Sequence, residues 1–354
     1  MLATSILIPL LTTLVVASPT KRQQQQQQPA GLNALAKQHG KYIGTATNSF
    51  NLLGNNPGGA YLDILRREFK GALTAENEGK WDAIHPTPDQ YNWAGMDAIV
   101  AEARQSPEKV FVRGHTFVWH AQTPAYINQM TDPEQLKAAL RDHAMNVAVR
   151  YKNDWTYLDA INEPLNEDGT LRDSVWHRVL GEDYLEIALN IIHEAAPSIK
   201  LCINDYNIEG VNAKSKGMLA IAKKLLERGA PLHCIGFESH FIAGSMPQDI
   251  AASMQQFTDL GLEVPLTELD VRVRVTGNDQ ASSADLAVQA NDYRTAVKTC
   301  LDNRLCPGIT IWQFYDPISW IPSLTPGWGA ATPYDANFLP KPAYEAMREA
   351  LATQ

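Results

Sequence analysis

The sequence has few cysteines and no long basic or apolar stretch, and each absence excludes a class of protein. Four cysteines in 354 residues are too few for a disulfide scaffold, and they lack the paired spacing of a zinc site. Lys and Arg number 30 against 39 Asp and Glu, a formal net charge of −9, which argues against nucleic acid or an anionic membrane as a partner. After the N-terminus no apolar run approaches the roughly twenty residues of a membrane span.

The remaining composition is that of a globular protein. Hydrophobic residues make up 45% of the chain and charged residues 19%, so a full core can be buried and wholesale disorder is excluded. The length suits one large domain or two ordinary ones.

The N-terminus predicts secretion. Residues 2–16 are mostly apolar and lead to a small-residue cleavage pattern, which indicates a signal peptide over residues 1–17. Lys21-Arg22 and six glutamines, Gln23 to Gln28, follow. This stretch, residues 18–30, is expected to be a trimmed pro-segment or a charged low-complexity linker. A single catalytic domain is expected over residues 31–352.

Short β-prone runs alternate with helix-period segments from residue 42 onward. The expected strands are Tyr42–Asn48, Ala72–Asn77, Lys109–Thr116, Trp155–Glu163, Ile199–Asn207, His233–Phe241, Val264–Val271 and Gly308–Tyr315. Such alternation implies parallel pairing, and eight units over roughly 320 residues predict an α/β fold, a (β/α)8 barrel. A doubly wound open sheet is the alternative, but no Gly-rich phosphate turn follows the first strand.

Polar residues gather at the carboxyl ends of six of these strands. They are Glu76-Asn77, His115, Asn162-Glu163, Asn204-Asp205, Glu238 with His240, and Glu268 with Asp270. A barrel brings all carboxyl ends of its strands to one rim, where barrel enzymes keep their active sites. A shared site at this rim is therefore expected.

Two glutamates at this rim suit glycosidic bond cleavage. Such cleavage needs one carboxyl group to protonate the leaving oxygen and a second to attack or to activate water. Glu163 and Glu268, far apart in sequence, are placed to face each other across the barrel mouth. No Gly-x-Ser-x-Gly elbow or His-Glu-x-x-His motif is present, and the two-carboxylate chemistry requires no metal or organic cofactor.

Four tryptophans supply flat apolar faces on which sugar rings can stack. They are Trp119, Trp312, Trp320 and Trp328.

The cysteines form two pairs in the sequence. Cys300 and Cys306 lie six residues apart around a polar turn, and a secreted chain is expected to bridge them, with a gain of about 2 kcal/mol. Cys202 and Cys234 lie in apolar strand-like segments. Buried free thiols are the favoured interpretation for this pair, and a bridge is the alternative if the two strands are neighbours.

The chain resembles the glycoside hydrolase family 10 endo-β-1,4-xylanases, specifically the secreted fungal members, over essentially all of residues 32–350. The resemblance is carried by seven segments in order: Thr74–Asp82, Arg113–Pro124, Asp159–Pro164, Ile203–Asn207, Gly236–Phe241, Leu266–Val271 and the Trp-rich stretch Trp312–Trp328.

The resemblance implies a role for each catalytic residue. Glu163 matches the general acid/base, and Glu268 matches the nucleophile of a retaining double displacement. Asn162 would hydrogen-bond the 2-hydroxyl of the reacting sugar. His240, oriented by Asp270, would help to keep Glu268 ionised.

The resemblance also implies sugar-binding positions. Glu76, Asn77 and Lys80 would hold the next sugar on the non-reducing side, with His115, Trp119 and Gln122 along the same side, Tyr206 and Asn207 on the leaving-group side, and Trp312 and Trp320 around the reacting ring.

Two positions depart from the family pattern. Glu238 stands where members often have Gln, and Gly79 where they often have Met. Glu238 also lies among the expected substrate contacts, and its like charge is expected to raise the apparent pKa of the acidic cluster and to move the pH optimum. The sequence gives no physical reason for Gly79.

The substrate inferred from the resemblance is xylan and its oligosaccharides, and the protein is expected to be a monomer. Trp320 is the candidate wall that would exclude the hydroxymethyl group of a glucan. The alternatives are a related glycosidase acting on β-1,4-glucan or mannan, and a catalytically silent carbohydrate-binding barrel. The second conflicts with the presence of both glutamates together with Asn162 and His240.

Overall fold

The computed structural model describes residues 30–54, 59–276 and 280–353. The expected signal peptide and all of the expected pro-segment except Ala30 lie outside the described residues. The fold below belongs to the compact unit that spans Gly31–Gln354.

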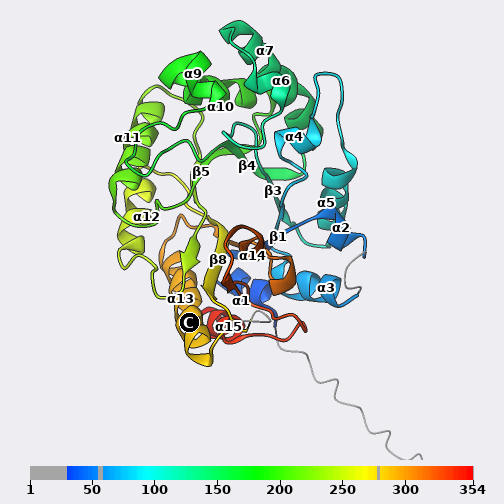
Figure 1. Cartoon of the computed structure of the whole chain (residues 1–354), viewed down its shortest axis with the longest axis vertical. Coiled ribbons are helices and arrows are strands. Elements are labelled where there is room, and N and C mark those ends of the chain that lie inside the picture. Colours follow the sequence, from blue (N-terminus) through cyan, green and yellow to red (C-terminus); the bar gives the residue numbers. More distant parts are fainter. Residues whose placement is uncertain (1–29, 55–58, 277–279, 354) are drawn as a thin grey trace, which may run out of the picture. The chain divides into compact units, whose positions relative to one another are not determined.

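A closed barrel of parallel strands forms the centre of this unit (Figure 1). Its strands are β1 (Tyr42–Thr47), β2 (Ala72–Ala75), β3 (Phe111–Gly114), β4 (Trp155–Asn162), β5 (Lys200–Asp205), β6 (Cys234–Phe237), β8 (Leu266–Arg274) and β9 (Gly308–Ile311). Strand β9 pairs in parallel with both β8 and β1 and so closes the ring. The predicted (β/α)8 barrel is confirmed, and an open doubly wound sheet is excluded.

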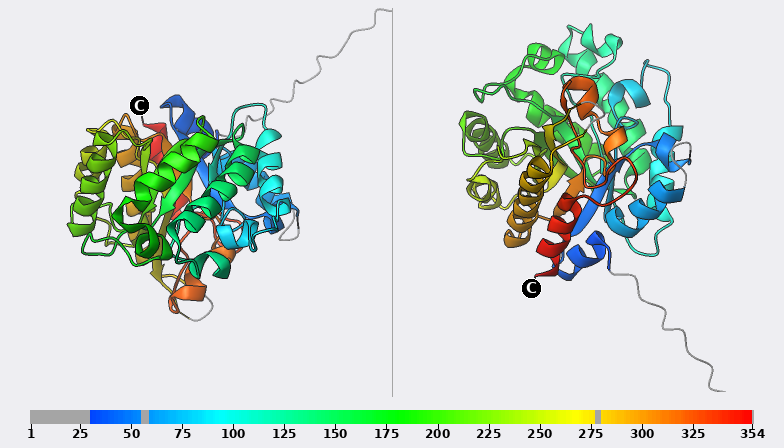
Figure 2. Two further views of the ribbon diagram at one scale, coloured as in Figure 1. Left: turned by 90° about the horizontal axis from the view of Figure 1, so that it is seen from above. Right: turned by 60° about the horizontal axis from the view of Figure 1, so that its bottom comes forward.

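Helices surround the strands on the outside (Figure 2). The longer ones are α1 (Leu32–Gln38), α3 (Gly59–Ile64), α5 (Ala94–Arg104), α7 (Pro133–His143), α10 (Tyr184–Ala195), α11 (Ala213–Glu227), α12 (Ile250–Thr258), α13 (Ser283–Asp302) and α15 (Pro342–Ala352). Helix α9 (Val175–Leu180) is as long as α3, and α2 (Ser49–Leu52), α4 (Trp81–Ile84), α6 (Ala125–Asn128), α8 (Val149–Tyr151) and α14 (Ile321–Leu324) are shorter. Among the described residues, no helix combines the length and the apolarity that crossing a bilayer requires.

Local sequence signals set the ends of these elements. Strand β4 is buried along almost its whole length, as expected of a parallel strand covered on both faces. Helix α7 begins where Asp132 accepts hydrogen bonds from two backbone N–H groups and Pro133 takes the first position. Helix α11 begins with a reciprocal capping box between Asn212 and Ser215. These caps fix the residue at which each of the two helices begins.

Two disulfides lie among the described residues. Cys300–Cys306 joins the last turn of α13 to the segment just before β9, as predicted. The favoured expectation of free thiols at Cys202 and Cys234 is wrong, because the structure joins them in a disulfide. Their strands β5 and β6 are neighbours, and the two cysteines are directly paired in register with Cα atoms 4.5 Å apart, which is within reach of a bridge.

The segment predicted as one strand from His233 to Phe241 is two strands. Strand β6 ends at Phe237, and β7 (His240–Ile242) begins three residues later. Between them Ser239 adopts a left-handed φ of 64°, and its backbone N–H donates to the buried Glu209 carboxylate at 2.6 Å. Strand β7 then pairs with β8 so that His240 lies opposite Asp270. The break therefore places His240 beside the strand that carries Glu268.

Candidate active site

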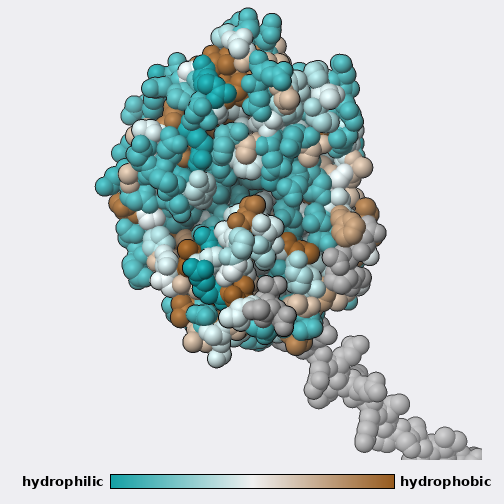
Figure 3. Space-filling model, in the orientation of Figure 1, coloured by the Kyte–Doolittle hydropathy of each residue, from teal (hydrophilic) through white to brown (hydrophobic). Residues whose placement is uncertain are grey.

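A cleft of about 580 Å³ opens at the carboxyl ends of the barrel strands. Figure 3 shows this hollowed face, which is mostly hydrophilic. The cleft is lined by Glu76, Asn77, Lys80, His115, Trp119, Gln122, Asn162, Glu163, Tyr206, Asn207, Glu238, His240, Glu268, Arg272, Trp312, Trp320 and Leu324. Every predicted catalytic and substrate-binding residue except Asp270 and the expected stacking residue Trp328 is in this set, and Asp270 is buried directly behind His240.

Glu268, near the start of β8, is surrounded by hydrogen-bond donors. Its Oε1 accepts from Asn204 Nδ2 at 2.8 Å and lies 3.9 Å from His115 Nδ1. Its Oε2 lies 3.3 Å from His240 Nε2. Burial alone would raise the pKa of this carboxyl group, but His115 and His240 outweigh burial and lower it below its ordinary value. Glu268 is therefore an ionised carboxylate with a fixed orientation.

His240 is held by Asp270 from behind. His240 Nδ1 forms an ion pair with Asp270 Oδ2 at 3.0 Å, and the same oxygen accepts from Trp320 Nε1 at 2.7 Å. Burial opposes the charged ring, but Asp270 and the Glu268 carboxylate raise the pKa of His240 to about 10. The imidazole is thus a cation at neutral pH, and both of its nitrogens face carboxylates.

Glu163 follows the last residue of β4 and has a different environment. Its backbone adopts a left-handed φ of 48°, and its N–H donates to the carbonyl of Asn204 at 2.8 Å. His120 Nδ1 lies 3.7 Å from Oε2, but burial lowers the pKa of His120 to about 4, so this ring is neutral near pH 7. Burial, together with the charge of Glu268, raises the pKa of Glu163. This carboxyl group therefore tends to hold a proton.

Glu238 is the third carboxyl group of the cluster. It is buried, and its Oε1 accepts from Asn204 Nδ2 at 3.1 Å. Burial and the neighbouring charges of Glu268 and Glu163 raise the pKa of Glu238 well above its ordinary value. The proton of the cluster therefore resides on Glu238, while Glu268 stays ionised.

The side of the cleft formed by the β2 loop presents a hydrogen-bonded polar set. Lys80 Nζ donates to Asn77 Oδ1 at 3.0 Å and lies 5.0 Å from the centre of the Trp119 ring. Glu76 Oε2 accepts from Gln313 Nε2 at 2.6 Å. These contacts orient a carboxylate, an amide and an ammonium group toward one face of the cleft, an arrangement suited to hydroxyl groups.

The opposite side is formed by the β4 and β5 loops. Tyr206 Oη accepts from Arg172 at 2.8 Å, and the ammonium of the buried Lys214 lies 3.5 Å from the Tyr206 ring centre. Arg172 Nε also donates to the carbonyl of Glu163 at 3.1 Å. The Asn207 amide donates to Glu167 at 3.1 Å. The Arg172 guanidinium therefore links the Tyr206 hydroxyl group to the Glu163 backbone.

Gly79 has a steric explanation that the sequence did not supply. A Cβ built on Gly79 would lie 2.5 Å from the carbonyl oxygen of His115, closer than carbon and oxygen can approach. The backbone of the β2 loop therefore packs directly on the His115 segment.

The expectation that Trp328 offers a face to the cleft is wrong. Trp328 lies in the short strand β10 (Trp328–Gly329) and is absent from the cleft lining. Its ring is covered by guanidinium groups, with that of Arg274 at 4.0 Å and that of Arg272 at 5.8 Å. The short antiparallel pairing of β10 with β8 places this ring beside β8.

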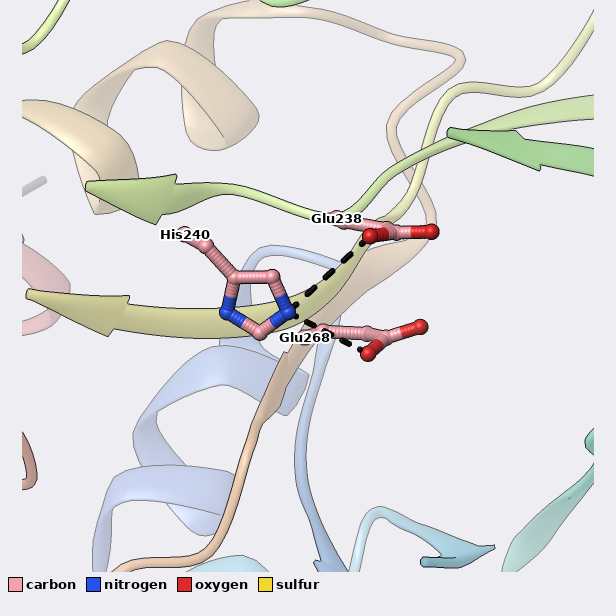
Figure 4. Close-up of side chains that lie close together, drawn as sticks. All are labelled: Glu238, His240 and Glu268. Atoms are coloured by element: carbon pink, nitrogen blue, oxygen red, sulfur yellow. Dashed lines mark hydrogen bonds and ion pairs between the residues drawn. The ribbon is translucent and has the colours of Figure 1, made fainter. Parts of the chain in front are cut away.

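Glu238, His240 and Glu268 lie close enough together to suggest a cation site (Figure 4). Their chemistry does not fit one. A histidine ligates a metal through a neutral nitrogen lone pair, whereas both nitrogens of His240 face carboxylates and its pKa is raised to about 10. The three residues are better described as a proton-sharing cluster.

Sequence reasoning missed four residues that contribute to the site. Asn204 was noted at the strand end but given no role, although it joins Asn162, Glu238 and Glu268. Arg172 was not singled out, because it lies in a loop. Arg272 could have been found from strand alternation, since it follows Glu268 and Asp270 at a period of two. Leu324 offered no signal.

A (β/α)8 barrel whose rim holds one ionised and one proton-retaining glutamate, flanked by aromatic rings, has the construction of a glycosidase. The glycosyl hydrolase family 10 model matches residues 31–350. The chain belongs to this family and is a glycoside hydrolase.

Known relatives are similar over most of the chain. An endo-1,4-β-xylanase A of Phanerodontia chrysosporium is 38% identical over 321 residues, covering 90% of this chain and 76% of its own. An endo-1,4-β-xylanase of Agaricus bisporus is 37% identical, covering 89% and 93%. The structure of xylanase 10B from Thermotoga petrophila in complex with xylobiose is 36% identical with a TM-score of 0.87, covering 92% of this chain and 98% of that one.

Proposed function

We propose that this protein is an endo-1,4-β-xylanase that cleaves internal β-1,4-xylosidic bonds of xylan by a retaining double displacement. The proposal rests on one observation: the pKa values of two glutamates in the same cleft are shifted in opposite directions. The pKa of Glu268 is lowered, and the pKa of Glu163 is raised. A retaining glycosidase needs one carboxylate that attacks and one carboxyl group that donates a proton.

In the first step the Glu268 carboxylate attacks the anomeric carbon of the reacting sugar. The glycosidic C–O bond breaks, and Glu163 gives its proton to the leaving oxygen. Asn162, whose side-chain oxygen accepts from Asn204 at 2.9 Å, is positioned to contact the 2-hydroxyl group. The products are a glycosyl ester on Glu268 and a shortened chain with a free hydroxyl group.

In the second step Glu163, now ionised, takes a proton from water. The water oxygen bonds to the anomeric carbon, and the ester bond to Glu268 breaks. His240 stabilises the carboxylate that leaves, through its 3.3 Å contact with Glu268. Two inversions at one carbon give net retention of configuration.

The assignment of sugar positions follows the two sides of the cleft. Glu76, Asn77 and Lys80 hold the next sugar on the non-reducing side, while Tyr206 and Asn207 contact the leaving group. His115, Trp119, Gln122 and Glu238 complete the lining, and Trp312 and Trp320 wall the reacting ring. Asp270 acts through His240 and Trp320, so it is a positioning residue.

The choice of xylan rests on the relatives, which are named as xylanases, and on the crowding that Trp320 imposes. Trp320 is fixed by its hydrogen bond to Asp270, so a hydroxymethyl group could not easily displace it. A glycosidase specific for glucan or mannan is the alternative.

We further propose that the enzyme is a secreted fungal monomer, with a signal peptide over residues 1–17, a pro-segment or linker over 18–30, and a catalytic domain over 31–352. The relatives from Phanerodontia and Agaricus are fungal. Neither nucleic acid nor membrane is expected as a partner, because the net charge is −9.

The deciding experiment compares reducing-sugar release from purified xylan and from carboxymethylcellulose, with Glu268→Ala as the matched control. Release of short oligosaccharides from xylan alone, absent in the variant, is expected. Activity on carboxymethylcellulose instead would be consistent with the proposed mechanism but would contradict the assignment of xylan as the substrate. Inactivity on both polymers would favour the carbohydrate-binding barrel.

A further inference from the structure

Arg272 extends the functional face of β8 toward the mouth of the cleft. Alternate residues of a strand share a face, so Glu268, Asp270 and Arg272 point the same way. At about 3.3 Å per residue, Arg272 begins roughly 13 Å from Glu268 along the strand. Arg272 lines the same cleft as Glu268. Its guanidinium group therefore lies nearer to the mouth of the cleft than the glycosidic bond that is cleaved. Side groups of a bound polysaccharide would extend into this region.

This guanidinium group has no acidic partner among the residues that the structure describes. Its Nε is buried and makes no hydrogen bond, and the one contact of its charged end within the described part of the chain is the Trp328 ring at 5.8 Å. Asp270, the acid nearest to it on β8, is already shared by His240 and Trp320. By contrast, the buried Arg113 is paired with Asp159.

An arginine with free donors in a cleft suits a carboxylate, because its planar fork matches two carboxylate oxygens. We propose that Arg272 binds the carboxylate of a uronic acid side group carried by the polysaccharide, on a sugar at or next to the reacting-ring position. A neutral xylose backbone has no group that needs a guanidinium. The proposal rests on the proposed function and names a class of decorated substrate for it.

The charges deeper in the cleft do not oppose such a ligand strongly. Burial and neighbouring carboxylates raise the pKa of Glu238 and Glu163, which lowers their negative charge, and the His240 cation lies between Glu268 and Asp270. Leu324, 67% exposed and part of the same lining, adds apolar surface for the ring of the side group.

The test uses one polymer in two forms: a xylan decorated with uronic acids, and the same xylan after chemical reduction of its carboxyl groups to alcohols. The measured quantity is the ratio of kcat/KM on the acidic form to that on the reduced form. Arg272→Gln is compared with Arg274→Gln. Arg274 also stacks on Trp328 but, two residues further toward the end of β8, does not line the cleft, so it controls for loss of that stacking.

The full-length enzyme is expected to favour the acidic form about tenfold, and Arg272→Gln to bring the ratio close to one. Arg274→Gln should leave the ratio as it is. Arg272→Lys, which keeps the charge but not the fork, should give an intermediate ratio. About 1 M NaCl, where the screening length is about 3 Å, should reduce the preference of the unmodified enzyme.

An unchanged ratio in Arg272→Gln would overturn the proposal. Equal losses on both forms in Arg272→Gln and Arg274→Gln would overturn it too, because they would show that these arginines serve to hold Trp328. Activity on linear, undecorated xylo-oligosaccharides is measured in parallel. Its absence in the unmodified enzyme would overturn the proposed function itself, whereas its presence with an unchanged ratio would reject the role of Arg272 alone.

Discussion

Strand β8 and the residue after β4 carry the same side chain, a glutamate, in opposite settings. On β8, Glu268 accepts from Asn204 and faces the charged His240, so its pKa is lowered. After β4, Glu163 accepts from Asn162 at 3.3 Å and lies near the weakly basic His120, and burial together with the charge of Glu268 outweighs these contacts and raises its pKa. The neighbours of each glutamate, supplied by other strands, decide which one attacks and which one donates the proton.

The largest predicted effect is at the β8 side. Glu268→Ala removes the nucleophile, so no glycosyl-enzyme can form and turnover on xylan should fall on the order of 10⁵-fold. Added azide should restore activity and give a product of α configuration, since azide then attacks the anomeric carbon directly. A β-configured azide product would assign Glu268 to the other role.

The β4 side should respond according to the leaving group. Glu163→Ala should lower activity on xylan on the order of 10³-fold, because the leaving oxygen is no longer protonated. Formation of the glycosyl-enzyme from an aryl glycoside with a strongly acidic phenol, measured as a burst of released phenol, should stay within about tenfold of the unmodified enzyme. Equal losses on both substrates would contradict the assignment.

Substitution of Trp320, which is hydrogen-bonded to Asp270 of β8, tests whether the surroundings of Glu268 also select the substrate. Trp320→Ala should raise the activity on β-1,4-glucan relative to xylan by about tenfold, because the space for a hydroxymethyl group opens. The same change removes the hydrogen bond to Asp270, so overall activity should fall. Trp320→Phe keeps a ring but also loses that bond. Similar ratios for both variants would show that crowding does not set the preference.

The smallest effect concerns the proton on Glu238. Activity should be lost as pH falls through the lowered pKa of Glu268, which must be ionised, and as pH rises through the raised pKa values of Glu163 and Glu238. Glu238→Gln leaves only Glu163 to lose a proton, so the alkaline limb of kcat/KM should move to higher pH while the acidic limb stays. A shift of the acidic limb instead would mean that Glu238 is ionised beside Glu268, as its sequence position first indicated.

The barrel and the polar residues at its rim were predictable because they depend on periodic signals, whereas the other cleft residues were predicted from the family resemblance. Apolar strands that finish in polar residues place Glu76, His115, Glu163 and Glu268 at one rim whatever the details of packing. The break after Glu238 was not predictable, because it depends on Ser239 donating to Glu209, thirty residues earlier in the chain.

Features that depend on which strands are neighbours could not be predicted from the sequence either. The Cys202–Cys234 bridge required the register of β5 against β6, and the placement of Trp328 required its pairing with β8. Asn204 is one polar residue among many at the rim until the structure shows it bonded to three site residues. The roles of the glutamates came from the family resemblance, and the structure supplies a physical reason for the difference between them.

The most direct test of this difference is the anomeric configuration of the first sugar released, followed by proton NMR before mutarotation. If Glu268 attacks as an ionised nucleophile and Glu163 serves first as acid and then as base, the new reducing end appears in the β configuration and the α form grows in only later. Release of the α form first would show a single displacement by water and would contradict the assignment of Glu268 as the nucleophile.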